Sequence, residues 1–160
     1  MRIIQGRIIP EQQVLSWFSN YARHLDLEVR YQLASAYTSC GYFTTFGNVY
    51  PLAQAAVETN HFTTEQFTVN RNPALNGNYA FDTYSAGVVA HMAHLAAYVY
   101  IDDGLDSFTK SFVRLSPAIS QMQKSSLRGS ARDWEDFQDR WNSEPSYVKQ
   151  IHYVAQTILG

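Results

Sequence analysis

The chain has 160 residues, of which 46% are hydrophobic and only 16% are charged. This composition excludes a disordered chain and predicts one globular domain, residues 1–160, with a single substantial core. The net charge of −2 gives no basic surface for nucleic acid or acidic lipid. The single cysteine, Cys40, excludes an internal disulfide and is expected to be a buried thiol. No apolar run approaches the roughly 20 residues of a membrane span, and no signal peptide is evident.

Two amphipathic helices are predicted in the first quarter of the chain. Apolar residues recur three or four positions apart from Pro10 to about Arg23, and again from Leu25 to Ser39. Gly41 is expected to end the second of these helices. A third helix is predicted to begin at Pro51, whose fixed φ suits a first helical turn, with Asn48 as its cap.

The third helix carries a single carboxylate, Glu58, on an otherwise apolar and alanine-rich segment. Carbonyl groups at a helix C-terminus disfavour an ionised carboxylate, and the apolar neighbours Ala55 and Phe62 would remove water from it. Both effects raise the pKa of a carboxyl group, which suits a general acid near neutral pH. The alternative is a solvated surface Glu, which is the commoner situation, and spacing alone does not separate the two.

Between Thr63 and Ser85 helical periodicity is absent, and Asn, Gly, Pro and Thr accumulate. We predict a loop and a short hairpin here, with Tyr79, Phe81 and Thr83 alternating between its faces. An apolar helix follows over residues 87–98 and is expected to pack against the helix that carries Glu58. Further helical pieces are predicted over 108–115, interrupted at Pro117, then towards Leu127, around Trp134 and over 145–159.

Four blocks occur in a particular order: residues 53–59 (AQAAVET), 72–74 (NPA), Phe81, and 87–98 (GVVAHMAHLAAY). In this order they resemble the glucosaminidase family of peptidoglycan hydrolases. The segment from Ile4 to Gly6 and the residues from Arg128 to Ile151 are similar to the opening and closing segments of that family. The resemblance implies a mainly α (α+β) lysozyme-like domain, in which a small β-hairpin and loop lobe forms one wall of a cleft.

The resemblance also implies an activity. The Glu of the "ET" pair is the catalytic acid of the family, and this role falls on Glu58. The reaction would be hydrolysis of the β-1,4 bond after N-acetylglucosamine in peptidoglycan, without a cofactor. The protein would then act outside the cell, at the wall or as part of a virion, without an evident signal peptide. Its oligomeric state is left open.

Glycosidases of this kind use a second group opposite the acid. A second carboxylate lies about 6.5–9.5 Å from the acid in inverting enzymes and about 5–5.5 Å in retaining ones. Asp82 and Glu65 are the candidates, and we favour Asp82, with Tyr84 beside it as a group that positions water. The alternative roles are a turn-forming Asp and a half-buried aromatic.

Six further residues are predicted to bind the glycan: His61, Asn72, Asn76, Tyr79, His91 and Trp134. His91 and His94 share a helix face, but no third ligand stands at a suitable spacing, so we predict no metal site. The resemblance favours one histidine bonded across the helix pair and the other on the cleft floor. Trp134, Trp141 and Tyr147 are expected either to face the sugar or to cap the core.

The chain departs from the family pattern in two places. Asn60 and His61 replace the Gly and Trp that usually follow "ET", and Leu75 replaces a residue of a glycine-containing loop. Two alternatives to peptidoglycan hydrolysis therefore stay open. One is a catalytically impaired glycan-binding or structural domain of a larger assembly, such as a phage tail, and the other is a glycosidase for another N-acetylglucosamine polymer.

Overall fold

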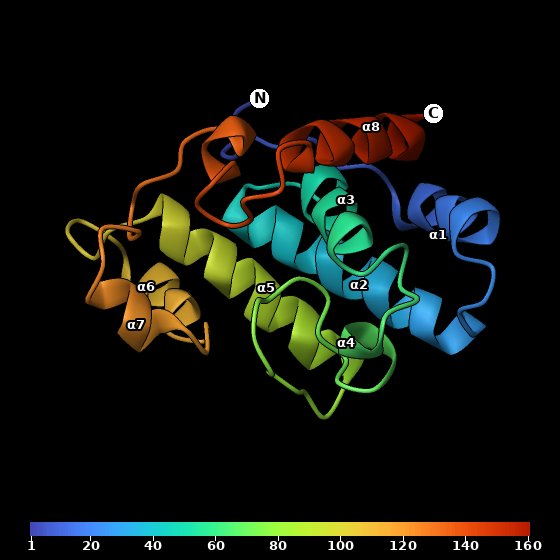
Figure 1. Cartoon of the computed structure of the whole chain (residues 1–160), viewed down its shortest axis with the longest axis horizontal. Helices are drawn as coiled ribbons and strands as arrows, with labels where there is room; N and C mark the ends of the chain where they lie inside the picture. Colours follow the sequence, from blue (N-terminus) through green and yellow to red (C-terminus); the bar gives the residue numbers. More distant parts are fainter.

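The computed structural model describes all residues 1–160 and is mainly helical, as the sequence predicts (Figure 1). It contains eight α-helices and one 3-10 helix: α1 (Glu11–Tyr21), α2 (Leu27–Thr44), α3 (Val49–Glu58), α4 (Glu65–Thr68), α5 (Tyr84–Val99), α6 (Ser107–Val113), α7 (Ile119–Gln123), η1 (Trp134–Phe137) and α8 (Tyr147–Leu159). Two isolated β-bridges, between Arg2 and Asp133 and between Gln138 and Asn142, are the β pairings present. No helix is both long enough and apolar enough to cross a membrane.

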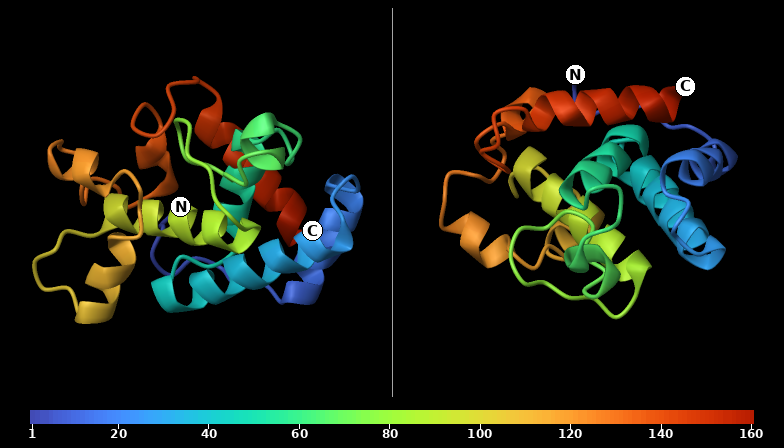
Figure 2. Two further views of the ribbon diagram at one scale, coloured as in Figure 1. Left: turned by 90° about the horizontal axis from the view of Figure 1, so that it is seen from below. Right: turned by 45° about the vertical axis from the view of Figure 1, so that its right-hand side comes forward.

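The helices pack as two main pairs. Helix α8 lies across α3, and α5 lies along α2 (Figure 2). Helix α1 covers α2 and reaches α8, while α6 and α7 form a small group beside α5. The predicted packing of α5 on α3 is therefore wrong as a main contact, because α3 buries its apolar side mostly against α8.

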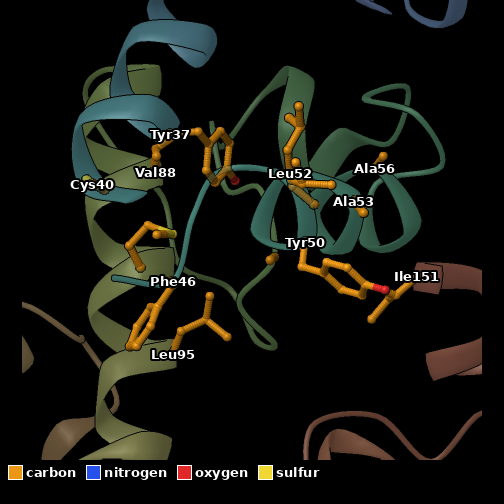
Figure 3. Packing of buried hydrophobic residues seen from close by; sticks show 14 of the residues in the cluster. Tyr37, Cys40, Phe46, Tyr50, Leu52, Ala53, Ala56, Val88, Leu95 and Ile151 are labelled. Atoms are coloured by element: carbon orange, nitrogen blue, oxygen red, sulfur yellow. The ribbon is translucent and has the colours of Figure 1, made fainter. Parts of the chain in front are cut away.

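One core of 43 buried hydrophobic residues joins these helices. Figure 3 shows part of it, with Tyr50 of α3 beside Ile151 of α8. Cys40 lies in this core, where burial raises the pKa of its thiol to about 11. The thiol is therefore a buried, protonated group.

The start of α3 differs from the prediction in one respect. Asn48 occupies the N-cap position, but its side chain makes no cap hydrogen bond. The Asn48 side chain instead accepts from the Ile9 N–H at 2.9 Å and donates to Thr38 Oγ1 at 2.9 Å. Asn48 thus ties the N-terminal segment to α2, and the predicted capping role is wrong.

The predicted helix end at Gly41 is also wrong, because α2 continues to Thr44. Gly41 is needed here for a close approach between segments. A Cβ atom at position 41 would lie 2.6 Å from the carbonyl carbon of Gly47. The Gly41 carbonyl also accepts from the Gly47 N–H at 3.2 Å.

The predicted hairpin between Thr63 and Ser85 is wrong as well. The segment contains the short helix α4, followed by a loop over residues 69–83 without a strand. The Asn72 side chain closes a turn in this loop, because its Oδ1 accepts from Leu75 N at 2.8 Å and its Nδ2 donates to Leu75 O at 2.8 Å. The loop lies tightly on α5, where a Cβ atom at Gly87 would overlap the carbonyl oxygen of Arg71.

We predict that Gly41→Ala lowers the free energy of unfolding by about 1–3 kcal/mol, because the added methyl group would meet backbone atoms that have no space to move. Urea unfolding followed by circular dichroism measures this change. Ser39→Ala, at an exposed position of the same helix, is the control and should change stability by about 0.5 kcal/mol or less. Equal stabilities of the two variants would contradict the packing argument.

Candidate active site around Glu58

Glu58 is the last residue of α3, and its side chain is half-buried. The helix ends here because Thr59 turns its side chain back, with Oγ1 donating to Ala55 O at 2.6 Å. The same oxygen accepts from the Phe62 N–H at 2.9 Å, which closes the following turn. Glu58 therefore projects from a fixed helix end, as the sequence predicts.

The turn after Glu58 is left-handed at three successive residues, none of which is glycine. Asn60, His61 and Phe62 have φ of 47°, 55° and 66°. Side chains other than those of Gly, Asn and Asp are rarely accommodated there. Of the three residues, Asn60 is the one whose side chain best tolerates this conformation.

Tyr147 of α8 reaches Glu58 from the opposite side of the α3–α8 pair. Its phenol donates a hydrogen bond of 2.7 Å to Glu58 Oε1. Burial raises the pKa of Glu58, while this bond and the nearby Asn142 and Trp141 side chains act in the opposite direction. The effect of burial is the larger, so the pKa of Glu58 lies above its ordinary value.

A chain of buried hydrogen bonds leads from the core to this carboxyl group. The Gln54 side-chain N–H donates to Tyr147 Oη at 2.8 Å, and Gln54 Oε1 pairs with His91 Nε2 at 2.8 Å. His91 Nδ1 pairs with Tyr37 Oη, also at 2.8 Å. The four side chains come from α3, α8, α5 and α2.

All bonds of this chain point the same way. Gln54 Oε1 can only accept, so His91 carries its proton on Nε2 and its Nδ1 accepts from the Tyr37 hydroxyl. Burial lowers the pKa of His91 to about 3, which keeps the ring neutral. Each residue of this hydrogen-bond chain thus donates to the next one towards Glu58. The residues deep in the core therefore set Tyr147 as the donor to Glu58.

The other two predicted catalytic residues make no hydrogen bond to Glu58. Asp82 is exposed at the end of the 69–83 loop. Tyr84 begins α5, where its ring packs on Phe67 at 5.0 Å and lies under the Arg71 guanidinium at 5.5 Å. The alternative candidate Glu65 is exposed in α4. The structure thus brings Tyr147 to the carboxyl group, and Asp82 stays a prediction.

Three of the predicted glycan-binding residues are fully buried and are corrected to structural roles. Asn72 holds the turn at residues 72–75, and His91 belongs to the hydrogen-bond chain. Trp134 packs in the core against Tyr50, with ring centroids 5.4 Å apart. None of the three side chains is exposed to contact a sugar.

The remaining predicted glycan-binding residues line two grooves. His61 lines a groove of about 430 Å³ between α3 and α8, together with Lys149 and Tyr153. Asn76 and Tyr79 line a groove of about 340 Å³ between the 69–83 loop, α5 and α7, and His94 belongs to the same groove. His91 thus makes the expected bond across the helices, whereas His94 lines a groove that Glu58 does not line.

The sequence reasoning did not assign the residues that contact Glu58 to catalysis. Gln54 belongs to the AQA block, and a buried amide on an alanine-rich helix needs a polar partner. That requirement was the available signal for the Gln54–His91 pair. No local signal joined Tyr147 to Glu58, because they stand 89 positions apart in the chain.

No group of three or more His, Cys, Asp or Glu side chains in the structure is placed to hold a metal ion. Comparisons of the chain with protein families, with characterised proteins and with solved structures found no match. The geometry thus describes a half-buried carboxyl group with an oriented phenol, at the end of a helix, in a mainly helical protein.

We predict that Tyr147→Phe raises the pKa of Glu58 above its value in the wild-type protein. The phenol bond favours the ionised carboxylate, so its loss favours the protonated form. Side-chain ¹³C NMR titration measures the pKa, and Glu58→Gln identifies the signal by its absence. An unchanged or lower pKa in a folded Tyr147→Phe protein would contradict this assignment.

We also predict a pH dependence of stability from His91. Its pKa is about 3 in the folded protein against 6.5 in the unfolded chain. Below pH 6.5 the unfolded chain therefore binds the additional proton, and the free energy of unfolding falls as the pH falls. The slope for this residue reaches about 1.4 kcal/mol per pH unit.

The measurement for His91 is urea unfolding of wild type and His91→Gln at pH 4.5, 5.5 and 6.5. Glutamine keeps hydrogen-bonding groups but does not titrate, so its stability should depend less steeply on pH over this range. The comparison is needed because His94 adds to the slope and Glu58 opposes it. Parallel pH profiles of the two proteins would show that His91 does not titrate as stated.

Proposed function

We propose that the protein hydrolyses the β-1,4 glycosidic bond after N-acetylglucosamine in peptidoglycan, with Glu58 as the general acid. The observation that carries the proposal is the Glu58 carboxyl group, whose pKa is raised by burial and which accepts a bond from Tyr147. The order of the four sequence blocks gives the substrate class, by their resemblance to the glucosaminidase family.

The proposed reaction uses Glu58 in its protonated form. The carboxyl proton moves to the glycosidic oxygen as the bond between that oxygen and C1 of N-acetylglucosamine breaks. A water molecule adds its oxygen to C1 and loses one proton, which restores the Glu58 carboxyl group and completes the hydrolysis. The Tyr147 hydroxyl stabilises the Glu58 carboxylate that forms when the proton leaves.

Asp82 remains our proposed second carboxylate, with Tyr84 beside it. Its exposed position at the end of the 69–83 loop leaves it accessible to substrate. In this role the carboxylate would activate the attacking water or stabilise positive charge at C1. The proposed place of action is the cell wall or a virion that meets it, because peptidoglycan is found at the wall.

The experiment is release of reducing sugar from purified peptidoglycan by wild type and by Glu58→Gln, with product ends identified by mass spectrometry. We predict a loss of about 10²–10⁴-fold for Glu58→Gln, the usual contribution of a general acid. N-acetylglucosamine should stand at the new reducing ends. Glu28→Gln, an exposed glutamate of α2, is the matched control and should keep wild-type activity.

The outcomes separate the proposal from its alternatives. Cleavage that persists in folded Glu58→Gln would remove Glu58 from the role of acid. Glycan binding without cleavage by any folded protein would favour a binding or structural domain. Cleavage of chitin but not of peptidoglycan would favour a glycosidase for another N-acetylglucosamine polymer.

A further inference from the structure

The groove between the 69–83 loop, α5 and α7 has the dimensions and lining of a small-molecule site. Its volume is about 340 Å³, within the range of about 300–1,000 Å³ typical of ligand pockets. Tyr79 supplies accessible aromatic surface, and the buried Leu75, Met122 and Tyr98 line the groove from the core side. Such surfaces suit the apolar face of a pyranose ring.

No lining residue of this groove carries a charge. The ten lining residues include neither an acidic residue nor Lys or Arg. His94 is the one lining residue that could carry a positive charge, but burial lowers its pKa to about 4, so it is neutral at pH 7. An anionic ligand would find no cation here, whereas an uncharged polar ligand would lose no ion pair on binding.

Several polar groups of the groove have no partner within the protein. His94 Nδ1 bonds to Ser116 Oγ at 2.9 Å, but its Nε2 makes no hydrogen bond. Thr64 Oγ1 is the one fully enclosed side-chain polar atom without a partner, so His94 Nε2 keeps some contact with solvent. Gln121 on α7 is exposed, and its amide bonds to no protein group. Amide, imidazole and phenol groups of this kind match sugar hydroxyl and acetamido groups.

Trp141 connects this groove to Glu58. Its indole packs on His94 with ring centroids 4.7 Å apart, and its carbonyl accepts from Asn76 Nδ2 at 2.7 Å. The same Trp141 side chain lies near the Glu58 carboxyl group and lowers its pKa. The buried Trp141 therefore adjoins both the groove wall and the Glu58 carboxyl group, which places the groove in the neighbourhood of the proposed site.

We infer that the groove between the 69–83 loop, α5 and α7 binds an uncharged N-acetylhexosamine ring of the glycan, at a distance from the scissile bond. The inference rests on the proposed function for the identity of the sugar. Gln121 and Tyr79 are the residues that contact the ring, and His94 Nε2 bonds to one of its polar groups.

The test is isothermal titration of Glu58→Gln, which holds substrate without turnover, with N-acetylglucosamine tetramer and dimer. Adding Gln121→Ala or Tyr79→Ala should weaken tetramer binding by roughly threefold to tenfold, the effect of one hydrogen bond or ring contact. Gln123→Ala, an exposed glutamine of α7 outside the groove, is the matched control and should leave affinity unchanged. The affinity for the dimer should change less than the affinity for the tetramer when Gln121 or Tyr79 is replaced.

Two further arms identify where the sugar lies and which sugar it is. Lys149→Ala tests the groove between α3 and α8, and a loss confined to this variant would overturn the inference. A glycan fragment with free muramic acid carboxylates tests the ligand charge. It should bind no more tightly than the uncharged tetramer, because the groove offers no cation to its carboxylates.

Failure of the inference and failure of the proposed function give different results. If wild type cleaves peptidoglycan while Gln121→Ala and Tyr79→Ala bind the tetramer normally, the groove assignment falls and the activity stands. If these variants weaken tetramer binding while wild type cleaves no glycan, the groove stands and the hydrolase proposal falls. Absence of tetramer binding to folded Glu58→Gln overturns the groove assignment.

Discussion

The structure depends on the pairing of polar side chains inside an alanine-rich core. Tyr37, His91, Gln54 and Tyr147 are buried on four different helices, and each must find a partner because an unpaired buried polar group is costly. Apolar contacts tolerate repacking, whereas hydrogen bonds of 2.7–2.8 Å require particular positions and directions. This chain of hydrogen bonds therefore fixes how α2, α3, α5 and α8 are turned relative to one another.

The same chain of hydrogen bonds ends at the Glu58 carboxyl group, which we propose as the general acid. The core holds Tyr147 as a donor, and Tyr147 in turn orients the Glu58 carboxyl group. Burial and the phenol bond act on the pKa of Glu58 in opposite directions, and burial prevails. A raised pKa shifts the carboxyl group towards its protonated form, which is the form that a general acid uses.

The backbone beside Glu58 is held by packing more than by its own preference. Three left-handed residues follow after Thr59, and they are retained because Phe62 is fully buried against Phe18 and Phe67. Backbone strain of this kind persists where surrounding structure fixes the conformation, and it gathers at functional sites. Asn60 fits this conformation, since Asn is among the residues that accept it.

The sequence by itself predicted the main helices and the place of Glu58 at a helix end, because apolar periodicity and the end of a helix are local properties. It did not determine the roles of Gly41, Asn72, His91 and Trp134. A glycine can end a helix or admit a neighbouring backbone, and a polar or aromatic side chain can face a sugar or a buried partner. Only the tertiary structure decided between these roles, by placing Gly47 against Gly41 and Gln54 against His91. The alternation at residues 79–83 predicted strands that did not form, since a strand needs a partner strand and this segment has a single backbone bond to the preceding loop, from Phe81 N to Asn70 O.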